Sequence, residues 1–437
     1  MPQDRRHAST RRSTPYIAAA AASLLVATAS ACGAAAPDDG SGGKAAPRQL
    51  VVWDWKSGDA NAKEYFEKAE ADFKKKHPDI EVEFVAQPYD HYYTLLGTAI
   101  ESGKGPDVAL FNGGAQLRER AGSLVVLDGH VRKLRDRLTG WEAFEDKGGT
   151  YAVPVTLQGF PFYYNKAVYK KAGLDPDAPP KTLDQLVKVC QAIKKSGSSC
   201  FSLGNKEGLG IEFFLSGFAP GVFPPKQYDA WLAGERDWSS PEVRQIFELW
   251  VRGKREGWYN DGVNSTATFM DQYSKFSGGE GGNVIGLLSD TAHWKSFGKY
   301  LGKNLGVYDP PLLSPKVAES FLPAEGGIGY GVLKRTPDAD IAYDLVQSLA
   351  SSGALESFAD GTGAIAADTT VEPPGKGSSV AGELVASLKT SKPLLHTALS
   401  AKTLDLLHRL SQELLGGDVS IDAALAQLGK SDRQTSK

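Results

Sequence analysis

The 437-residue sequence has little of what commonly marks an enzyme or a metal site. It contains only 3 cysteines and 7 scattered histidines, and the local signatures HExxH, GxSxG and Cys-x-x-Cys are absent. The apolar run 16–31 is shorter than the roughly 20 residues of a membrane-spanning helix. We therefore expect no catalytic residues, no metal site, no cofactor and no transmembrane anchor.

A phosphate-binding loop is also missing, although residues 101–114, ESGKGPDVALFNGG, look similar to one at first sight. Gly105 stands where Ser or Thr is needed, and a helical pattern precedes the glycines while a strand follows them, which reverses the required order. Gly103 is instead predicted to end a helix. The net charge is −3, and it becomes −6 when residues 1–31, with four Arg and one Asp, are removed. No nucleic-acid partner is expected.

The first 31 residues have the features of a secretion signal. Arginines at 5, 6, 11 and 12 precede the apolar run, and small residues precede Cys32. Ala29-Ser30-Ala31-Cys32 resembles a bacterial lipobox with Ala in the usual Leu position, so we expect lipidation of Cys32; plain secretion with a chance Cys is the alternative. Residues 32–48 are predicted to form a flexible tether. The protein should then be exported and anchored, through its lipid only, on the outer face of the bacterial cytoplasmic membrane.

The order strand, helix, strand, helix, strand over residues 50–111 indicates a parallel sheet with both faces covered. Ligands bind beyond the carboxyl ends of the strands in such sheets. These ends carry Trp55-Lys56, Gln87 with Tyr89-Asp90, and Phe111-Asn112. An aromatic ring beside hydrogen-bonding groups suits a sugar ring, although each aromatic could instead cover the core.

About 385 residues after the tether exceed what one hydrophobic core normally supports, so two domains are expected. Cys190 and Cys200 are predicted to form a disulfide, because the protein is exported and no His or third Cys lies near them in sequence.

Several segments in one order resemble the extracellular solute-binding proteins of ABC importers, in the sugar-binding group related to maltose-binding protein. They include LVVWDW, SGKGPDV, YAVPVTLQGFPFYYNK and GGIGYGVLKRTPDADIAYDLVQSLAS, and they extend across residues 50–428. The resemblance implies an α/β, two-lobe periplasmic-binding-protein-like fold, with a sheet flanked by helices in each lobe and a hinge between them. Lobe 1 should comprise 49–156 plus 305–350, lobe 2 should comprise 160–303 plus 352–430, and 431–437 should be a disordered tail. The crossings should fall near 155–160, near 303–308 and around Ser351.

The same resemblance implies that a carbohydrate is held between the lobes and delivered to the permease subunits of an ABC transporter, by a monomer that is not an enzyme. The ligand contacts it implies, together with those expected from the strand ends, are Trp55, Lys56, Asp59, Tyr89, Phe111, Asn112, Gln158, Glu212, Phe213, Asp290, His293, Trp294, Gly326 and Gly327. The sequence departs from the usual pattern of the family at three places. Asn112 replaces a carboxylate, Gln158 replaces Glu, and the segment SDTAHW replaces Gly-x-Trp. The identity of the solute therefore stays open. A non-sugar solute is one alternative, and a secreted carbohydrate-active enzyme using Glu212 and Asp290 is another.

Overall fold

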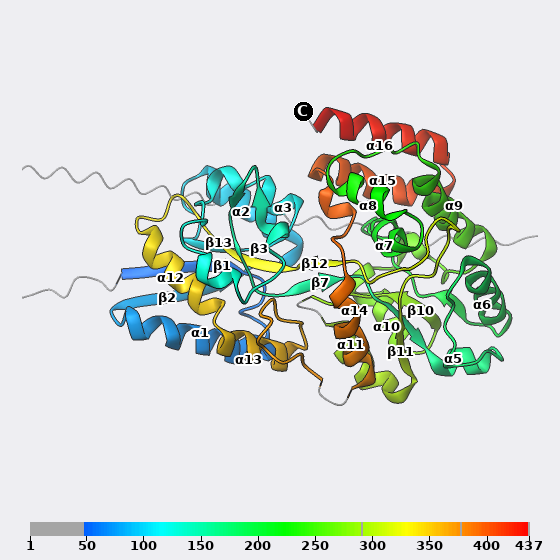
Figure 1. Ribbon diagram of the computed structural model, residues 1–437, viewed down its shortest axis with the longest axis horizontal. Coiled ribbons are helices and arrows are strands. Elements are labelled where there is room, and N and C mark those ends of the chain that lie inside the picture. The colour runs from blue at the N-terminus through cyan, green and yellow to red at the C-terminus, as the bar shows by residue number, and fades with distance from the viewer. Residues whose placement is uncertain (1–47, 290–291, 376–377, 436–437) are drawn as a thin grey trace, which may run out of the picture. The chain divides into compact units, whose positions relative to one another are not determined.

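The computed structural model describes residues 48–289, 292–375 and 378–435 and contains two main β-sheets flanked by helices (Figure 1). The first sheet has five strands in the order β2-β1-β3-β13-β6, and the second has four in the order β11-β8-β10-β9. We call each sheet, with the helices packed on it, the first and the second lobe. A separate two-stranded ladder joins β7 to β12. The predicted α/β fold, with a sheet flanked by helices in each lobe, is confirmed.

The first sheet begins as the sequence pattern predicts. Strand β1 (Arg48–Asp54) runs parallel to β2 (Ile80–Ala86) and β3 (Val108–Asn112). Helix α1 (Lys63–Lys76) buries one of its faces, which consists of Tyr65, Phe66, Ala69 and Phe73. Helix α2 (Tyr92–Glu101) ends before Gly103, whose φ is +67°. Gly103 thus follows the end of a helix, as predicted. Strand β13 (Ile328–Val332) adds antiparallel to β3 and to β6 (Val153–Pro154), which makes the sheet mixed.

The second sheet contains β8 (Phe162–Asn165), β9 (Ser199–Phe201), β10 (Gly281–Ile285) and β11 (Leu305–Tyr308). Its helices include α6 (Leu183–Lys195), capped by Thr182, and α9 (Pro241–Glu256), capped by Ser240. A large apolar core with fully buried Trp231, Trp250 and Trp258 joins them. A disulfide joins Cys190 on α6 to Cys200 on β9, with 4.8 Å between the Cα atoms.

The remaining described elements are shorter or lie outside the two main sheets. The strands are β4 (Glu145–Asp146), β5 (Gly149–Thr150), β7 (Leu157–Gly159) and β12 (Ala324–Gly326). The helices are α3 (Ala115–Arg118), α4 (Arg132–Arg135), α5 (Lys166–Lys171), α7 (Gly210–Phe218), α8 (Pro225–Leu232), α10 (Tyr273–Ser277), α11 (His293–Leu301), α12 (Ala339–Leu349), α13 (Ser352–Thr362), α14 (Ser379–Ser387), α15 (Ala401–Gly416) and α16 (Ile421–Thr435). The single turn named below is η1 (Ala60–Ala62).

Two predicted lobe boundaries are wrong. Strand β11 pairs antiparallel with β8, so 305–308 belongs to the second lobe, and the chain crosses back later, at β12. Helix α13 packs beside α1 in the first lobe, so the chain does not return near Ser351 (Figure 1). The Ala367 N–H donates to the Val155 carbonyl (2.9 Å), which keeps the following segment at the first lobe as well. An amphipathic helix pattern does not say which sheet the helix covers, which is why the sequence misplaced α13.

The predicted disordered tail is also wrong over 431–435, which belong to α16. Asp432 in this helix is buried, and its carboxylate accepts hydrogen bonds from Arg236 Nε (3.0 and 2.9 Å) and Trp238 Nε1 (3.1 Å). A polar segment without apolar periodicity gave no sign of these long-range partners.

The predicted signal peptide (1–31), Cys32 and the tether up to residue 47 lie outside the described residues. Within 48–435, apart from the two short gaps, no helix is both long and apolar enough to cross a bilayer.

Candidate functional site

Three predicted contacts meet at the carboxyl ends of β1, β2 and β3. The Trp55 ring packs edge-on against the rings of Tyr89 (5.4 Å between centroids), Tyr92 (4.8 Å) and Tyr93 (6.3 Å). Asn112 Nδ2 donates to the Tyr89 hydroxyl (3.2 Å), and the Asn112 backbone N–H donates to the Tyr93 hydroxyl (2.8 Å). Tyr89 is 47% exposed, and Trp55 and Asn112 are partly exposed. We call Trp55, Tyr89, Tyr93 and Asn112 the strand-end cluster; it offers an open aromatic face with polar groups at its rim.

The loop after β1 carries the other predicted contacts of the first lobe. Lys56 Nζ lies 3.9 Å from Asp59 Oδ2, and the Asp59 side chain caps η1 by accepting from the Asn61 N–H (2.9 Å). The turn is shaped by Asp54, whose Oδ1 accepts from the backbone N–H groups of Lys56 and Ser57, each at 2.5 Å. Asp54 is fully buried, and burial raises the pKa of its carboxyl to about 6. Sequence reasoning missed Asp54, because a carboxylate ending a strand gives no sign of its burial.

Phe111 is a buried core residue, which favours the alternative that it covers the core. It has no exposed surface and packs with Leu124, Phe144 and Leu333. Strand β13 pairs with β3 and places Gly329 opposite Phe111. The distant β13 is the reason that a strand-end pattern did not show this burial.

Glu212 on α7 is buried and already held by two histidines. Its Oε2 lies 2.6 Å from His408 Nε2 and its Oε1 lies 3.2 Å from His396 Nε2. Burial raises the pKa of the Glu212 carboxyl, but the two imidazoles outweigh this and leave the pKa below its ordinary value. Phe213 is buried too and packs on Phe160 (4.5 Å). Both side chains are occupied by protein contacts in this structure, and their role as ligand contacts stays a prediction.

His293 and Trp294 at the start of α11 are also occupied by protein contacts. His293 Nδ1 accepts from the Leu287 N–H (2.7 Å), and its ring stacks on Phe297 (5.0 Å). Trp294 Nε1 donates to the Gly363 carbonyl (2.8 Å) at the end of α13, and its side chain is buried. Trp294 therefore packs against the end of α13, and His293 packs against Phe297 and the loop that precedes α11. The predicted contact Asp290 lies outside the described residues.

The ladder of β7 and β12 brings Gln158 opposite Glu325. The Glu325 Oε2 accepts from Thr397 Oγ1 (3.0 Å), whereas its Oε1 is buried without a hydrogen-bond partner. Burial raises the pKa of Glu325 to about 8, so this carboxyl is mostly protonated at neutral pH. The Arg118 guanidinium of the first lobe donates to the Thr397 carbonyl of the second. Sequence reasoning missed Glu325, Thr397 and Arg118, which come together only through the crossing segments.

The predicted glycine wall is a place of close backbone packing. A Cβ on Gly326 would lie 2.2 Å from the Gly140 carbonyl oxygen, and one on Gly327 would lie 2.7 Å from Thr156 Oγ1. The Gly327 N–H donates to the Thr156 carbonyl (2.7 Å), and the Gly327 carbonyl accepts from the Gly113 N–H (3.0 Å). These glycines let β12 and the loop after β3 approach each other.

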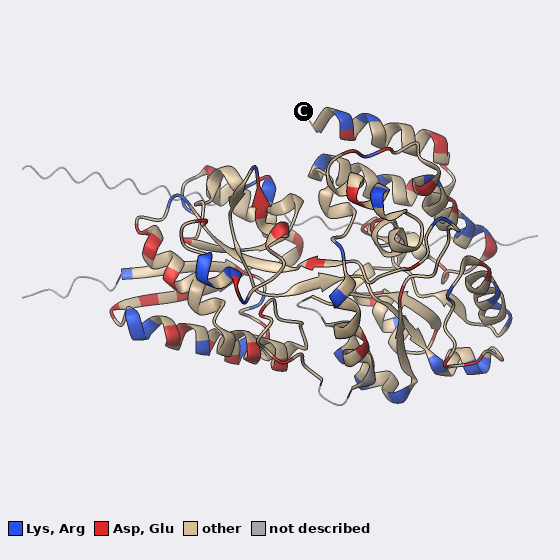
Figure 2. Ribbon diagram, in the orientation of Figure 1, with Lys and Arg blue, Asp and Glu red and all other residues tan. Residues whose placement is uncertain are grey.

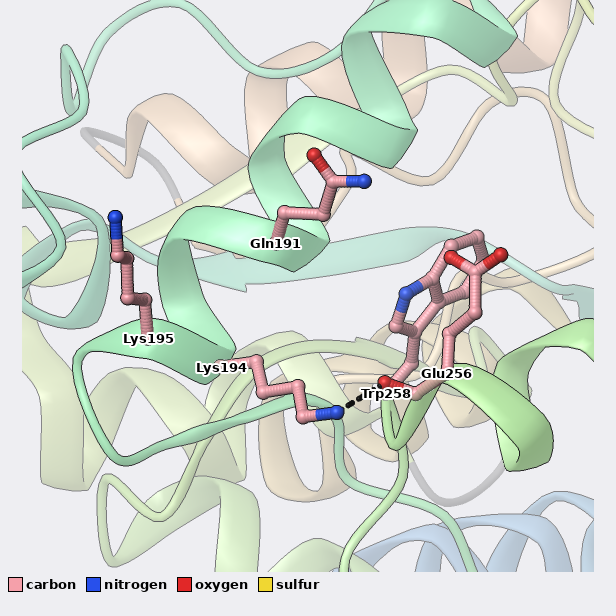
Figure 3. Close-up of a pocket in the computed structure, with 5 residues that line it drawn as sticks. All are labelled: Gln191, Lys194, Lys195, Glu256 and Trp258. Atoms are coloured by element: carbon pink, nitrogen blue, oxygen red, sulfur yellow. Dashed lines mark hydrogen bonds between the residues drawn. The ribbon is translucent and has the colours of Figure 1, made fainter.

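Charges of both signs are mixed over the helices of both lobes (Figure 2). No group of three or more His, Cys, Asp or Glu in the described part of the chain is placed to hold a metal ion. A surface hollow lies near the end of α6, lined by Gln191, Lys194, Lys195, Glu256 and Trp258 (Figure 3). Lys194 Nζ reaches across it to the Glu256 carbonyl (2.5 Å). None of the residues that line this hollow is a predicted contact. The strand-end cluster is the better candidate for the ligand site, because it has exposed aromatic and amide groups at the sheet edge where ligands of such folds bind.

Known proteins share extended stretches of sequence with this chain. Maltodextrin-binding protein MdxE of Bacillus subtilis is 24% identical over 322 residues, which cover 70% of this chain and 71% of that protein. An uncharacterized ABC transporter extracellular-binding protein of Pyrococcus horikoshii is 24% identical over 217 residues, which cover 47% of this chain. The chain spans about half the length of the two Pyrococcus horikoshii relatives that it matches, 48% and 52%.

Solved structures have the same architecture. A chitin oligosaccharide binding protein superposes with a TM-score of 0.78 at 20% identity, covering 88% of this chain and 98% of the other. The GacH receptor of Streptomyces glaucescens superposes with a TM-score of 0.70 at 18% identity, covering 89% and 98%. Residues 53–356 match the family described as "Bacterial extracellular solute-binding protein". Because that match covers most of the chain, the protein belongs to the bacterial extracellular solute-binding protein family.

Proposed function

We propose that this protein binds a carbohydrate between its two lobes and delivers it to the permease of an ABC transporter. The observation that carries the proposal is the strand-end cluster, in which the edge of the sheet presents Trp55 and Tyr89 beside the Asn112 amide. Apolar ring faces stack on sugar rings, and amide groups bond hydroxyls. Two relatives support the solute class by their names, a maltodextrin-binding protein and a multiple sugar-binding protein of Streptococcus mutans.

The transport mechanism we propose is closure about the ladder of β7 and β12. A solute that contacts both lobes binds the closed form more tightly than the open form, so it shifts the equilibrium between the two toward closure. Gln158 on β7 is the proposed contact at the hinge, and Lys56 and Asp59 are proposed contacts from the first lobe. The closed form is what the permease recognises, and ATP hydrolysis belongs to a separate subunit.

A second candidate is a non-sugar solute. The sn-glycerol-3-phosphate-binding protein UgpB of Yersinia enterocolitica is 45% identical over 53 residues, or 12% of this chain. That short match favours adding sn-glycerol 3-phosphate to any set of trial ligands. It is the weaker candidate, because Lys56, the cation of the binding loop, already lies near Asp59.

The test is calorimetric titration with maltose, maltotriose, chitin and xylan oligosaccharides, galactose and sn-glycerol 3-phosphate. Saturable heat with one of the sugars, followed by recovery of that sugar unchanged, is the expected result. Heat with the phosphate ester alone would favour the second candidate. New saccharide products would show an enzyme instead.

We further propose that the protein is a monomer anchored by lipid on Cys32. The basis is the lipobox-like sequence at 29–32. A Cys32→Ser variant should move from the membrane fraction to the medium and keep its fold. If the wild-type protein is released without an added acyl mass, the lipid anchor is ruled out.

A further inference from the structure

We propose that Asp54 is a positioning residue for the ligand site: its buried carboxylate fixes the turn that presents Trp55 and Lys56, and protonating it weakens solute binding. This inference rests on the proposed function, because it assigns a purpose to a turn beside the strand-end cluster. It adds a pH dependence to solute capture.

The geometry places Asp54 between a rigid strand and a ligand loop. It is the last residue of β1, and its backbone carbonyl accepts from the Gln87 N–H (2.7 Å), which ties the end of β1 to the end of β2. Its Oδ1 accepts from the N–H groups of Lys56 and Ser57, both at 2.5 Å. A carboxylate that accepts two backbone N–H bonds holds a tight turn after its own residue. The side chain therefore determines the direction in which Trp55 and Lys56 leave the strand.

The environment of Asp54 makes the charged form costly. The residue has no exposed surface, and its Oδ2 is buried without a hydrogen-bond partner. Among the described residues, the charged and titratable groups that act on it include Lys56 from the loop and the tyrosines Tyr65 on α1, Tyr92 on α2 and Tyr330 on β13. Lys56 is the only cation among them, and it also lies near Asp59. Burial therefore outweighs the turn's hydrogen bonds and raises the pKa of Asp54 to about 6.

Protonation changes stability and binding in opposite directions. The carboxyl has a higher pKa in the folded than in the unfolded chain, so the folded state binds the proton more tightly. Its contribution to the stability of the fold is therefore greatest below the unfolded pKa, near 3.8, and is lost as the pH rises through about 6. The charged acceptor that holds the Lys56 and Ser57 amides is, by contrast, present above pH 6. General acid unfolding would lower stability and affinity together, so this opposition distinguishes the positioning role.

The experiment compares wild type with Asp54→Asn, which keeps an acceptor oxygen but no charge. With maltotriose as the probe, or whichever sugar of the titration set gives saturable heat, the variant should bind about tenfold more weakly at pH 7.5, because its two turn bonds lose charge assistance. Wild-type affinity should fall toward that of the variant between pH 7.5 and 5, while the variant changes little. Equal affinities at pH 7.5 would overturn the proposal.

Two readouts need no ligand. Amide hydrogen exchange over residues 55–59, corrected for intrinsic rates, should be faster in the variant at pH 7.5; equal protection would overturn the positioning role. The melting temperature of the variant minus that of wild type should be larger at pH 7.5 than at pH 5, and the reverse order would overturn the assigned titration. If wild type binds no member of the ligand set, the proposed function fails, whereas the exchange arm still decides whether Asp54 fixes the turn.

Asp338→Asn is the matched control. Asp338 is the partly exposed cap of α12 and accepts from the Ile341 N–H (3.2 Å), a bond that lowers the pKa of its carboxyl. It is an aspartate in a comparable side-chain-to-backbone turn on another element. This variant should bind as wild type does at both pH values. A loss of affinity equal to that of Asp54→Asn would show a nonspecific effect and overturn the proposal.

Discussion

The carboxyl edge of the first sheet and the region around α7 in the second lobe were both predicted to contact solute, yet the structure treats them differently. Trp55, Tyr89 and Asn112 remain at least partly exposed, and they contact one another at the edge of the sheet. Glu212 is buried with its carboxylate bound to His408, and Phe213 is buried against Phe160. The difference teaches that a polar or aromatic residue can serve as a site only where the tertiary structure leaves part of its side chain exposed.

The largest expected effect concerns Glu325 on β12, whose Oε2 accepts from Thr397 and whose Oε1 is buried without a partner. Its pKa in the fold is about 8, against 4.5 for an ordinary Glu. The protonated Glu325 carboxyl therefore stabilises the fold fully below pH 4.5. This contribution to the free energy of unfolding is lost as the pH rises through about 8. Replacing Glu325 by Gln should remove that pH dependence, at most about 5 kcal/mol between pH 5 and 9. Urea unfolding at several pH values measures the free energy of unfolding of the wild type and of Glu325→Gln. Identical pH profiles for the two proteins would show that Glu325 is already ionised.

Glu212→Ala tests whether the α7 region is structural. Removing this carboxylate takes its partner from His408 and leaves His396 bonded to Ser216 alone, so the free energy of unfolding should fall by about 3 to 5 kcal/mol, as it does when one partner of a buried pair is lost. Denaturant unfolding gives the value. Wild-type stability combined with lost sugar affinity would restore Glu212 as a ligand contact.

Phe111→Ala should destabilise the first lobe without changing the site chemistry. The ring is fully buried, and truncating such a residue costs about 3 to 5 kcal/mol. Calorimetric melting should show a lower melting temperature, and titration under folded conditions should show nearly unchanged affinity. A variant with normal melting and weak binding would contradict the assignment of Phe111 to the core.

Trp55→Ala is the counterpart at the open edge. The ring is partly exposed and packs on Tyr89 and Tyr92, so its removal should weaken sugar binding by about 1 to 3 kcal/mol with a smaller loss of stability. Titration and melting of Trp55→Ala beside Phe111→Ala give the comparison directly. Loss of stability alone in both variants would mean that the strand-end cluster is only packing.

Local patterns predicted the β1–β3 unit well. Alternation and helix spacing define β1, α1 and β3, and the parallel order brings Trp55 and Asn112 to one edge. The burial of Phe111, Glu212 and Trp294, which the sequence did not show, depends on segments far apart in sequence. Strand β13 covers Phe111, α15 brings His408 to Glu212, and α13 brings Gly363 to Trp294. No local property of Glu212 or Trp294 reveals those partners, because amphipathic patterns show which face of a helix is buried and not what buries it.

A crystal structure of the protein with the sugar that gives saturable heat tests the central claim most directly. We expect the sugar ring against Trp55 and Tyr89, with hydroxyls bonded to Asn112 and, from the hinge, Gln158. Glu212 and Trp294 should keep their present protein partners in that complex. A sugar seated elsewhere, for instance in the hollow beside Trp258, with the strand-end cluster empty, would contradict the account.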